Sequence, residues 1–274
     1  MLKIGWFSTG RGPGSRKLLA AVQDEIASGR LDARIAVVVS NREPGEDENT
    51  DLFLKQVSDC GLPLVSLSSR DFRRRRGEKP VRKGELLPEW RSVYDREVMR
   101  LLEPHSFDIG VLAGYMLIFT DVFLSEYDLL NLHPAAPGGP TGIWQDVIWQ
   151  LIETRAKRAG VMMHLATPEL DEGPPVTFCT YPIRGPAFDP RWGNAEARTV
   201  EEIKAIEGEA NGLFAEIRRH GVAREVPLVI ETLRAFADSR IRISGKRPTD
   251  ADGNSIPPAD LTQEIERLVA QTPA

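Results

Sequence analysis

The sequence predicts an α/β protein with a Rossmann-like, mostly parallel sheet flanked by helices, and two observations support this prediction. Short apolar runs rich in β-branched residues recur through the first half of the chain, which is typical of strands buried on both faces. Segments with apolar residues three and four positions apart lie between these runs, as in amphipathic helices. Strands that alternate with helices form right-handed βαβ units around a parallel sheet.

The individual elements follow in chain order. In the first half we expect strands over 2–8, 33–40, 62–67, 107–114 and 129–134, with helices over 15–29, 49–61 and 88–104. In the second half we expect a helix over 143–158, strands over 159–167 and 174–183, and a helical region over 199–238 that breaks near His220-Gly221 and Pro227. Further strands and helices of the second half pack on the sheet. This pattern predicts one domain over 1–243, with halves 1–134 and 135–243, and a peripheral tail over 244–274.

Composition excludes several classes of protein. The chain has 274 residues, of which 41% are hydrophobic, so it can bury a large core. Its net charge of -5 argues against a general nucleic-acid binder. The two cysteines, Cys60 and Cys179, show no metal-ligand spacing, which fits a reduced, cytoplasmic setting. No apolar run approaches the roughly 20 residues that a membrane span requires, and the first apolar run is too short for a signal peptide.

A glycine-rich turn, STGRGPGSRKLL (8–19), follows the first strand and opens a helix for which Ser15 is a plausible N-cap. Backbone N–H groups at such a turn bind anions well. The turn has no GK[ST], and its glycines give GxGxG and not a dinucleotide fingerprint. Its glycines could equally serve only backbone geometry, but Arg11 and Arg16 favour an anion. The candidate phosphate-binding residues are Gly10, Arg11, Gly12, Gly14 and Ser15.

A second candidate site combines NLHP (131–134) with PELDEGP (168–174). Asn131 and His133 fall near the carboxyl end of an expected strand, where ligands bind in open parallel sheets. Asn131 can donate to an oxyanion, His133 can exchange a proton, and Asp171 can orient or charge the histidine. No nucleophile elbow is visible, so direct attack by the substrate's own nucleophile is more natural than a covalent intermediate. The alternative is that Asn131 caps a turn and His133 is an ordinary loop histidine.

The basic run DFRRRRGEKPVRK (71–83) lies between an expected strand and an expected helix. We expect it to be a solvated or mobile insertion. A dedicated anion-binding patch is the alternative.

The run VLAGYMLIFTDVFLSEYDLLNLHPA (111–135), with YDREV (94–98) before it and HLATPELDEGPPV (164–176) after it, resembles the 10-formyltetrahydrofolate-dependent formyltransferases. The resemblance is closest to members that act on glycinamide ribonucleotide in purine synthesis, and it extends from the first strand to about residue 243. An Asn-x-His-Pro motif and an Asp in an ELDxGP-type loop are catalytic in that family. They fall here on Asn131, His133 and Asp171.

The resemblance also implies two binding regions and small-molecule partners. The half 1–134 would bind the phosphate of the acceptor, and the half 135–243 would contribute to binding 10-formyltetrahydrofolate, without a metal. Nucleic acid and membrane are not expected as partners, whereas a homodimer is compatible with the resemblance. The implied folate-binding residues are Met116, Leu117, Ile118, Phe119, His164, Thr167, Glu169, Leu170 and Glu172.

Several positions depart from the family pattern. Leu117 replaces a common arginine on the folate side. Three departures concern the acceptor side. The glycine-rich turn is longer than in the family and carries Pro13, and Val222 stands where the family has a glutamate, with Glu225 close by. The segment AAPGGPTG (135–142), which follows NLHP, also differs from the family pattern. Two alternatives therefore stay open: another amine acceptor, such as an amino sugar nucleotide or an aminoacyl-tRNA, and a non-catalytic folate- or nucleotide-binding relative.

Overall fold

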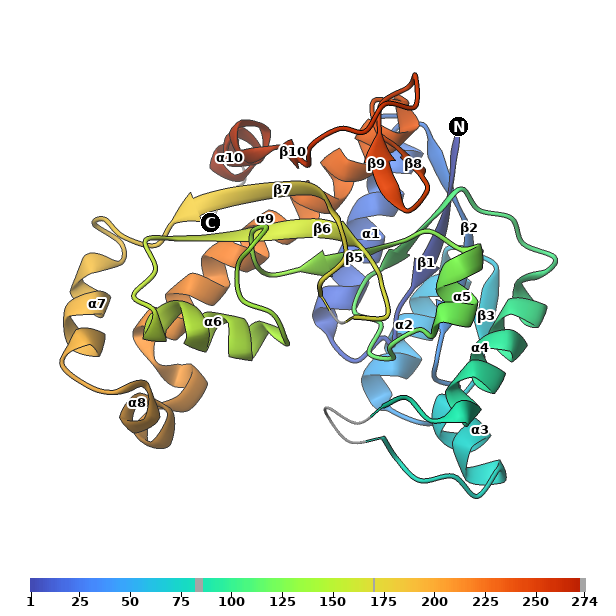
Figure 1. Cartoon of the computed structure of the whole chain (residues 1–274), viewed down its shortest axis with the longest axis horizontal. Helices are drawn as coiled ribbons and strands as arrows, with labels where there is room; N and C mark the ends of the chain where they lie inside the picture. The colour runs from blue at the N-terminus through green and yellow to red at the C-terminus, as the bar shows by residue number, and fades with distance from the viewer. Residues whose placement is uncertain (82–85, 170, 272–274) are drawn as a thin grey trace.

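The computed structural model describes residues 1–81, 86–169 and 171–271, and it is built around one mixed sheet (Figure 1). Within these residues the sheet has eight strands in the order β10-β7-β6-β5-β4-β1-β2-β3. Neighbouring strands are parallel from β3 to β5, β6 is antiparallel to β5 and to β7, and β10 is parallel to β7. This arrangement confirms the Rossmann-like, mostly parallel class. The strands are β1 (Leu2–Phe7), β2 (Ala33–Ser40), β3 (Leu64–Ser66), β4 (Ile109–Leu112), β5 (Leu129–His133), β6 (Arg158–Leu165), β7 (Pro175–Pro182) and β10 (Ala259–Asp260).

Helices cover both faces of the sheet, which explains why the strands are almost continuously apolar. In β1, Ile4 and Trp6 join a core with helices α1, α2, α6 and α9, whereas Phe7 joins a second core with α4 and α5. The Phe7 ring lies edge-on to Phe119 and Phe123 at centroid distances of 5.7 and 5.9 Å. The helices are α1 (Pro13–Ala27), α2 (Glu48–Asp59), α3 (Ser69–Arg75), α4 (Glu89–Leu102), α5 (Asp121–Glu126), α6 (Trp144–Glu153), α7 (Asp189–Glu196), α8 (Val200–Ile206), α9 (Gly212–Ala237) and α10 (Thr262–Gln271).

Helix α9 corrects the sequence-based expectation of a break near Gly221 and Pro227. It continues through both residues for 26 residues. Proline removes one backbone hydrogen bond, but α9 packs along β6 and β7, and the adjacent Leu228 is fully buried. Tertiary packing therefore outweighs the local preference. The actual break lies just before α9, where the Asn211 side chain accepts from the N–H groups of Leu213 and Phe214 as the N-cap.

The segment 244–274, expected to form a peripheral tail, lies at the edge of the sheet and is packed onto it as far as residue 271. A hairpin of β8 (Arg242–Ser244) and β9 (Arg247–Thr249) precedes β10, which pairs with β7. Helix α10 packs against α9 and buries Ile265 completely. The buried Arg224 of α9 holds Glu266 of α10 through two hydrogen bonds of 2.7 and 2.9 Å. The amphipathic period of α10 supplies the contact face.

Two smaller differences concern helix boundaries. The start of the basic segment 71–83 belongs to α3, whose N-cap Ser68 accepts from the N–H of Asp71, and Phe72 packs edge-on to Tyr94. The end of that segment, residues 82 and 83, lies outside the described residues. Helix α6 ends at Glu153, and β6 already begins at Arg158. Among the described helices, none is long and apolar enough to cross a membrane.

Candidate active site

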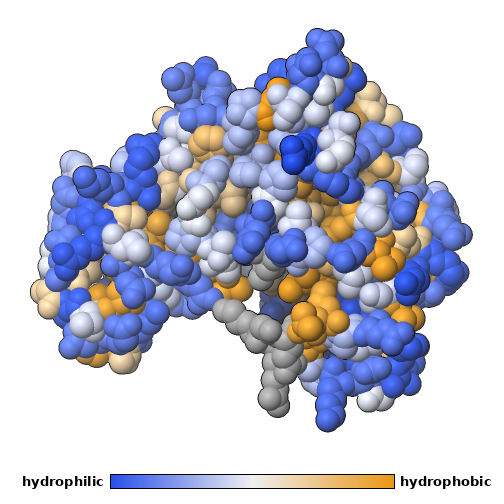
Figure 2. Space-filling model, in the orientation of Figure 1, coloured by the Kyte–Doolittle hydropathy of each residue, from blue (hydrophilic) through white to orange (hydrophobic). Residues whose placement is uncertain are grey.

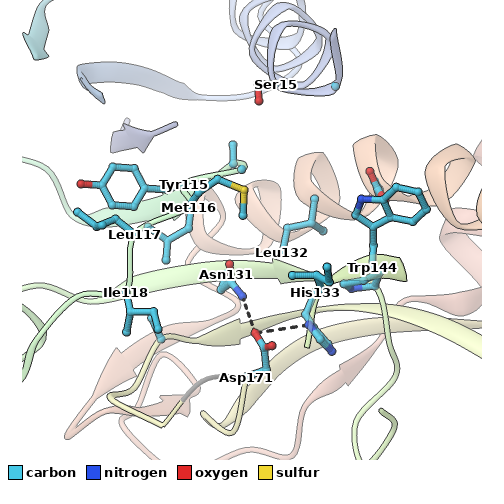
Figure 3. A pocket seen from close by; sticks show the side chains of 18 of the residues that line it. Ser15, Tyr115, Met116, Leu117, Ile118, Asn131, Leu132, His133, Trp144 and Asp171 are labelled. Carbon is cyan, nitrogen blue, oxygen red and sulfur yellow. Dashed lines mark hydrogen bonds and ion pairs between the residues drawn. The ribbon is translucent and has the colours of Figure 1, made fainter. Parts of the chain in front are cut away.

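A cavity of about 760 Å³ opens at the carboxyl ends of β1, β4 and β5. The strand order changes direction here, since β2 lies on one side of β1 and β4 on the other, and such a switch point is the usual ligand site of an open α/β sheet. Figure 3 shows Asn131, His133 and Asp171 together, Met116 and Trp144 on opposite sides, and Ser15 facing them. The face of the molecule seen in Figure 2 is largely hydrophilic, and apolar residues gather beside the hollow at the lower middle of that view.

Strand β5 brings the first two candidate catalytic residues to the cavity. Asn131 and His133 are two positions apart, so their side chains leave the strand on the same face. Antiparallel pairing places His164 of β6 directly opposite Asn131. All three residues line the cavity, as the position of NLHP at a strand end predicts for Asn131 and His133 and as the family resemblance implies for His164.

Asp171 reaches the same point from the loop between β6 and β7. Its backbone has a φ of 60°, a left-handed conformation that aspartate tolerates better than most residues. The loop turns tightly against β6, because a Cβ at Gly173 would lie 1.7 Å from the carbonyl oxygen of Leu165. One carboxylate oxygen of Asp171 accepts from the N–H of Gly142 at 3.1 Å. The other accepts from the side-chain amide of Asn131 at 3.2 Å.

The hydrogen bonds define which nitrogen of each histidine carries a proton. Nδ1 of His164 lies 2.9 Å from the carbonyl oxygen of Leu165, so it is the donor there. Nε2 of His164 is then the acceptor for the Asn131 amide, at 3.1 Å. Nε2 of His133 lies 2.9 Å from the carbonyl oxygen of Pro140 and donates to it. Neutral His133 therefore keeps the lone pair on Nδ1, which lies 3.5 Å from the Asp171 carboxylate.

Burial controls the charge of the two central groups. It lowers the pKa of His133 below its ordinary value, although the Pro140 carbonyl and the Asp171 charge act in the opposite direction. Burial raises the pKa of Asp171, but its polar neighbours, among them the Gly142 N–H, together outweigh burial, so the net shift of the pKa is downward. Near neutral pH the site thus holds a carboxylate beside a neutral imidazole, a pair suited to taking up a proton.

The same three groups have the residue types of a metal site. Ligand atoms of His133, His164 and Asp171 lie within 4.8 Å of one another. However, the amide nitrogen of Asn131 lies 3.1 Å from His164 Nε2 and 3.2 Å from Asp171 Oδ1, and it donates a hydrogen to each. Hydrogen bonds from the amide therefore satisfy two of the three ligand atoms.

The expected folate-binding residues are divided between the cavity and the surface. Residues 116–119, His164 and Thr167 line the cavity. Met116 is 55% exposed and Ile118 is 36% exposed, so they form an apolar wall that a flat ring system could cover. Phe119 lies beneath, stacked on Tyr115 with centroids 4.9 Å apart. Glu169 and Glu172 are exposed and lie outside the lining, and Leu170 lies outside the described residues.

The glycine-rich turn differs in detail from expectation. Helix α1 begins at Pro13 with Gly12 as its N-cap, so the expectation that Ser15 is the N-cap is wrong. Gly12 provides no side chain to satisfy the first N–H groups of α1, which leaves them available to an anion. Gly10 has a φ of 69° and packs over Phe53. Arg16 donates to Asn49 on α2. Four of the five expected phosphate-binding residues line the cavity, namely Arg11, Gly12, Gly14 and Ser15, whereas Gly10 does not.

Sequence analysis missed part of the cavity wall. Trp144 at the start of α6 and Arg218 of α9 line it, together with Glu225, which the sequence suggested only as a neighbour of Val222. Val222 itself is 42% exposed and lies outside the lining. Arg218 and Glu225 are seven residues apart, so a continuous helix would have placed them on one face. The expected break in α9 concealed this signal.

A Rossmann-like sheet that holds an amide, an imidazole and a carboxylate in mutual contact at its switch point defines an enzyme of the group-transfer class, equipped for an oxyanion and a proton. Residues 12–185 match the family model described as formyl transferase, which is more than half of the chain. The chain therefore belongs to the formyl transferase family and is a formyltransferase.

Characterised relatives and solved structures agree with this family. The chain is 28% identical over 248 residues to the phosphoribosylglycinamide formyltransferase of Escherichia coli, covering 89% of this chain and 93% of the relative. It is 28% identical over 152 residues to the formyltetrahydrofolate deformylase of Bacillus subtilis, covering 55% of this chain and 42% of that relative. The structure of the phosphoribosylglycinamide formyltransferase from Coxiella burnetii matches with a TM-score of 0.64 at 19% identity, covering 94% and 99% of the chains, and supports the fold.

Proposed function

We propose that the protein transfers the formyl group of 10-formyltetrahydrofolate to the amine of glycinamide ribonucleotide, a step of purine biosynthesis. The observation that carries this proposal is the contact of Asn131, His133 and Asp171 at one cavity, between an apolar wall and an uncapped helix N-terminus. A relative whose match covers 89% of this chain is named for formyl transfer to a phosphoribosylglycinamide. Its name supports the choice of acceptor.

In the proposed arrangement the two substrates enter from different sides. The rings of the folate lie on Met116 and Ile118, whose exposed apolar side chains gain from being covered. The phosphate of the acceptor lies at the turn 11–15, where free N–H groups, the dipole of α1 and the exposed Arg11 favour an anion. The amine of the acceptor then points toward the catalytic residues.

The chemistry is direct transfer. The amine attacks the formyl carbon, the formyl oxygen becomes an oxyanion, and Asn131 donates to it with the N–H that it shares with Asp171 in the free protein. The proton lost by the amine goes to the His133–Asp171 pair, in which Nδ1 of neutral His133 is unprotonated. The C–N bond to tetrahydrofolate then breaks, and the same pair returns the proton to the departing nitrogen.

His164 acts through Asn131 in this scheme. Its Nε2 holds one N–H of the amide, and its Nδ1 is fixed by the Leu165 carbonyl. The second N–H of Asn131 is therefore directed toward Asp171 and the cavity.

A second candidate is hydrolysis of the formyl group, with water as the acceptor. The relative named formyltetrahydrofolate deformylase supports it. The charged wall formed by Arg218 and Glu225 argues for a larger acceptor, because water would leave this part of the cavity unused. Other amines, such as an amino sugar nucleotide or an aminoacyl-tRNA, remain alternatives of the same chemistry. A non-catalytic relative would have no reason to keep the three catalytic groups in contact.

The experiment is a panel of acceptors at saturating 10-formyltetrahydrofolate. Formation of tetrahydrofolate and of formylated product is measured for glycinamide ribonucleotide, an amino sugar nucleotide and water alone. We expect glycinamide ribonucleotide to give the highest kcat/KM. Formate release that is independent of any amine would instead assign the protein to hydrolysis, and tight folate binding without turnover would support a binding role.

A further inference from the structure

The apolar wall of the cavity belongs to the segment 115–119, which lies beyond the end of β4 and is not part of the sheet (Figure 3). Within the described residues, the main chain of this segment makes no hydrogen bond to another main-chain group. Its position therefore depends on side chains. Near one end of the segment, the Arg91 guanidinium donates to the carbonyl oxygen of Ile118. At the other end, the N–H of Met116 is bound by a side chain of a different element.

That side chain is Thr9, which directly follows β1 and Ser8. Its hydroxyl oxygen accepts from the N–H of Met116 at 2.8 Å and donates to the side-chain oxygen of Asn41 at 2.7 Å. The N–H of Thr9 donates to the carbonyl oxygen of Gly114 at 3.1 Å. These bonds extend the contact between β1 and β4 beyond the ends of both strands. Thr9 precedes residue 12, so the family match does not include it.

Burial makes the hydroxyl of Thr9 difficult to replace. Thr9 is 1% exposed and Asn41 is 5% exposed. Because the hydroxyl hydrogen is donated to Asn41, a lone pair of the oxygen is left for the N–H of Met116. Without the hydroxyl, this N–H and the Asn41 oxygen would both lose a partner that water cannot easily replace. A buried polar group without a partner costs more than an average hydrogen bond contributes.

The main chain of Thr9 is held independently of its hydroxyl. The Thr50 hydroxyl of α2 donates to the carbonyl oxygen of Thr9 at 3.0 Å, and the bond from the Thr9 N–H to Gly114 is a main-chain contact. The next residue, Gly10, donates its N–H to the Ser8 hydroxyl at 3.2 Å. Loss of the Thr9 hydroxyl therefore releases Met116 but leaves the glycine-rich turn in place.

Thr9 does not line the cavity, whereas Gly114, Tyr115 and Met116 do. We propose that Thr9 is a positioning residue, whose hydroxyl fixes the main chain at Met116 and thereby places the apolar side chain that packs on the folate. This inference rests on the proposed formyl transfer, because that proposal assigns the apolar wall to the folate. Thr9 accordingly controls the binding of the folate and not that of the acceptor.

Steady-state kinetics of three variants test the proposal. Thr9→Val removes the hydroxyl at nearly constant shape, and Thr9→Ser keeps it. Thr232→Val is the matched control, since Thr232 is fully buried, its hydroxyl lies 2.6 Å from that of Thr177, and it is outside the cavity lining. Losing one neutral hydrogen bond corresponds to about a three- to tenfold loss of affinity.

We expect Thr9→Val to raise the KM for 10-formyltetrahydrofolate by this factor, with kcat and the KM for glycinamide ribonucleotide within about twofold of wild type. Thr9→Ser and Thr232→Val should leave both KM values within about twofold of wild type. An unchanged KM for the folate in folded Thr9→Val would overturn the proposal, as would an equal rise for both substrates or the same effect in Thr232→Val. Thr9→Ala, which places no methyl group against the N–H of Met116, takes the place of Thr9→Val if the valine variant does not fold.

Hydrogen exchange of the Met116 amide tests the contact without turnover. This amide should exchange about tenfold or more faster in Thr9→Val than in wild type and Thr9→Ser, because its acceptor is lost. Equal exchange in all three proteins would overturn the proposal. If wild type neither transfers a formyl group nor binds tetrahydrofolate, the proposed function fails, whereas exchange of the Met116 amide still decides whether Thr9 positions the wall.

Discussion

Replacement of Asp171 by asparagine tests the catalytic assignment with little change in shape. Asparagine tolerates the left-handed backbone that residue 171 adopts at a φ of 60°, so backbone strain does not confuse the result. The carboxylate oxygens accept from the N–H of Gly142 at 3.1 Å and from the amide of Asn131 at 3.2 Å. An amide has one oxygen, so in either orientation its NH₂ group faces one of these donors.

The magnitude follows from these contacts. One mismatched donor in a buried site costs about 1–3 kcal/mol of folding free energy, which lowers the melting temperature by a few degrees for a chain of this size. Loss of the proton-accepting charge should lower kcat by about 100- to 10,000-fold. Turnover is measured as tetrahydrofolate formation, and folding by thermal unfolding and circular dichroism.

Glu172→Gln is the control, because Glu172 is the adjacent carboxylate and lies exposed outside the cavity lining. It should leave turnover within about twofold of wild type. Asp171→Asn with near-normal kcat and an intact fold would refute the role of Asp171 in proton transfer. A loss of activity that only follows unfolding would also fail to support it.

Three further predictions concern other parts of the account. Asn131→Ala should lower kcat about 100- to 1,000-fold without unfolding the protein, as removal of one oxyanion donor does, and near-normal kcat with the physiological acceptor would contradict the assignment. Burial lowers the pKa of His133, so below about pH 6.5 the unfolded chain binds a proton that the folded chain refuses, and stability falls as the pH falls. Between about pH 7.5 and about pH 5.5, denaturant unfolding should show a smaller loss of the free energy of unfolding for His133→Gln than for wild type. An equal loss in both proteins would show that His133 does not contribute to the pH dependence of stability. Arg224→Ala should lower the free energy of unfolding by about 1–3 kcal/mol and expose α10 to limited proteolysis, because Arg224 anchors Glu266 and lies 4.4 Å from the centroid of the Tyr181 ring. The control Arg267→Ala, at an exposed position of α10, should change neither stability nor proteolysis.

The elements that sequence predicted well are those whose burial leaves a periodic or compositional mark. Strands such as 33–40 are buried on both faces and therefore read as apolar runs. The candidate catalytic motif NLHP was visible because Asn131 and His133 are polar residues at the end of such a run. Pairing of β5 with β6 then brings His164 beside Asn131, which the sequence order alone could not specify.

The failures have a common physical origin in tertiary packing. Pro227 and Gly221 are local helix breakers, but contacts with β6 and β7 hold α9 in one piece. That continuity places Arg218 and Glu225 on the cavity, where local preference had suggested an interruption. The packing of the tail after Ser244 was likewise not visible in the sequence, since the pairing of two residues of β10 with β7 and the ion pair of Arg224 with Glu266 are long-range contacts.

The fate of the formyl group is the most direct test of the central claim, which is direct transfer to the amine of the acceptor. The protein is mixed with 10-formyltetrahydrofolate that carries an isotopic label in the formyl group, in a single turnover with and without glycinamide ribonucleotide. We predict that the label passes to the amine of glycinamide ribonucleotide, that no label attaches to the protein when the acceptor is omitted, and that Asp171→Asn suppresses the transfer. Label recovered as formate at the same rate with or without the acceptor, or bound covalently to the protein, would contradict direct transfer at the Asn131–His133–Asp171 site.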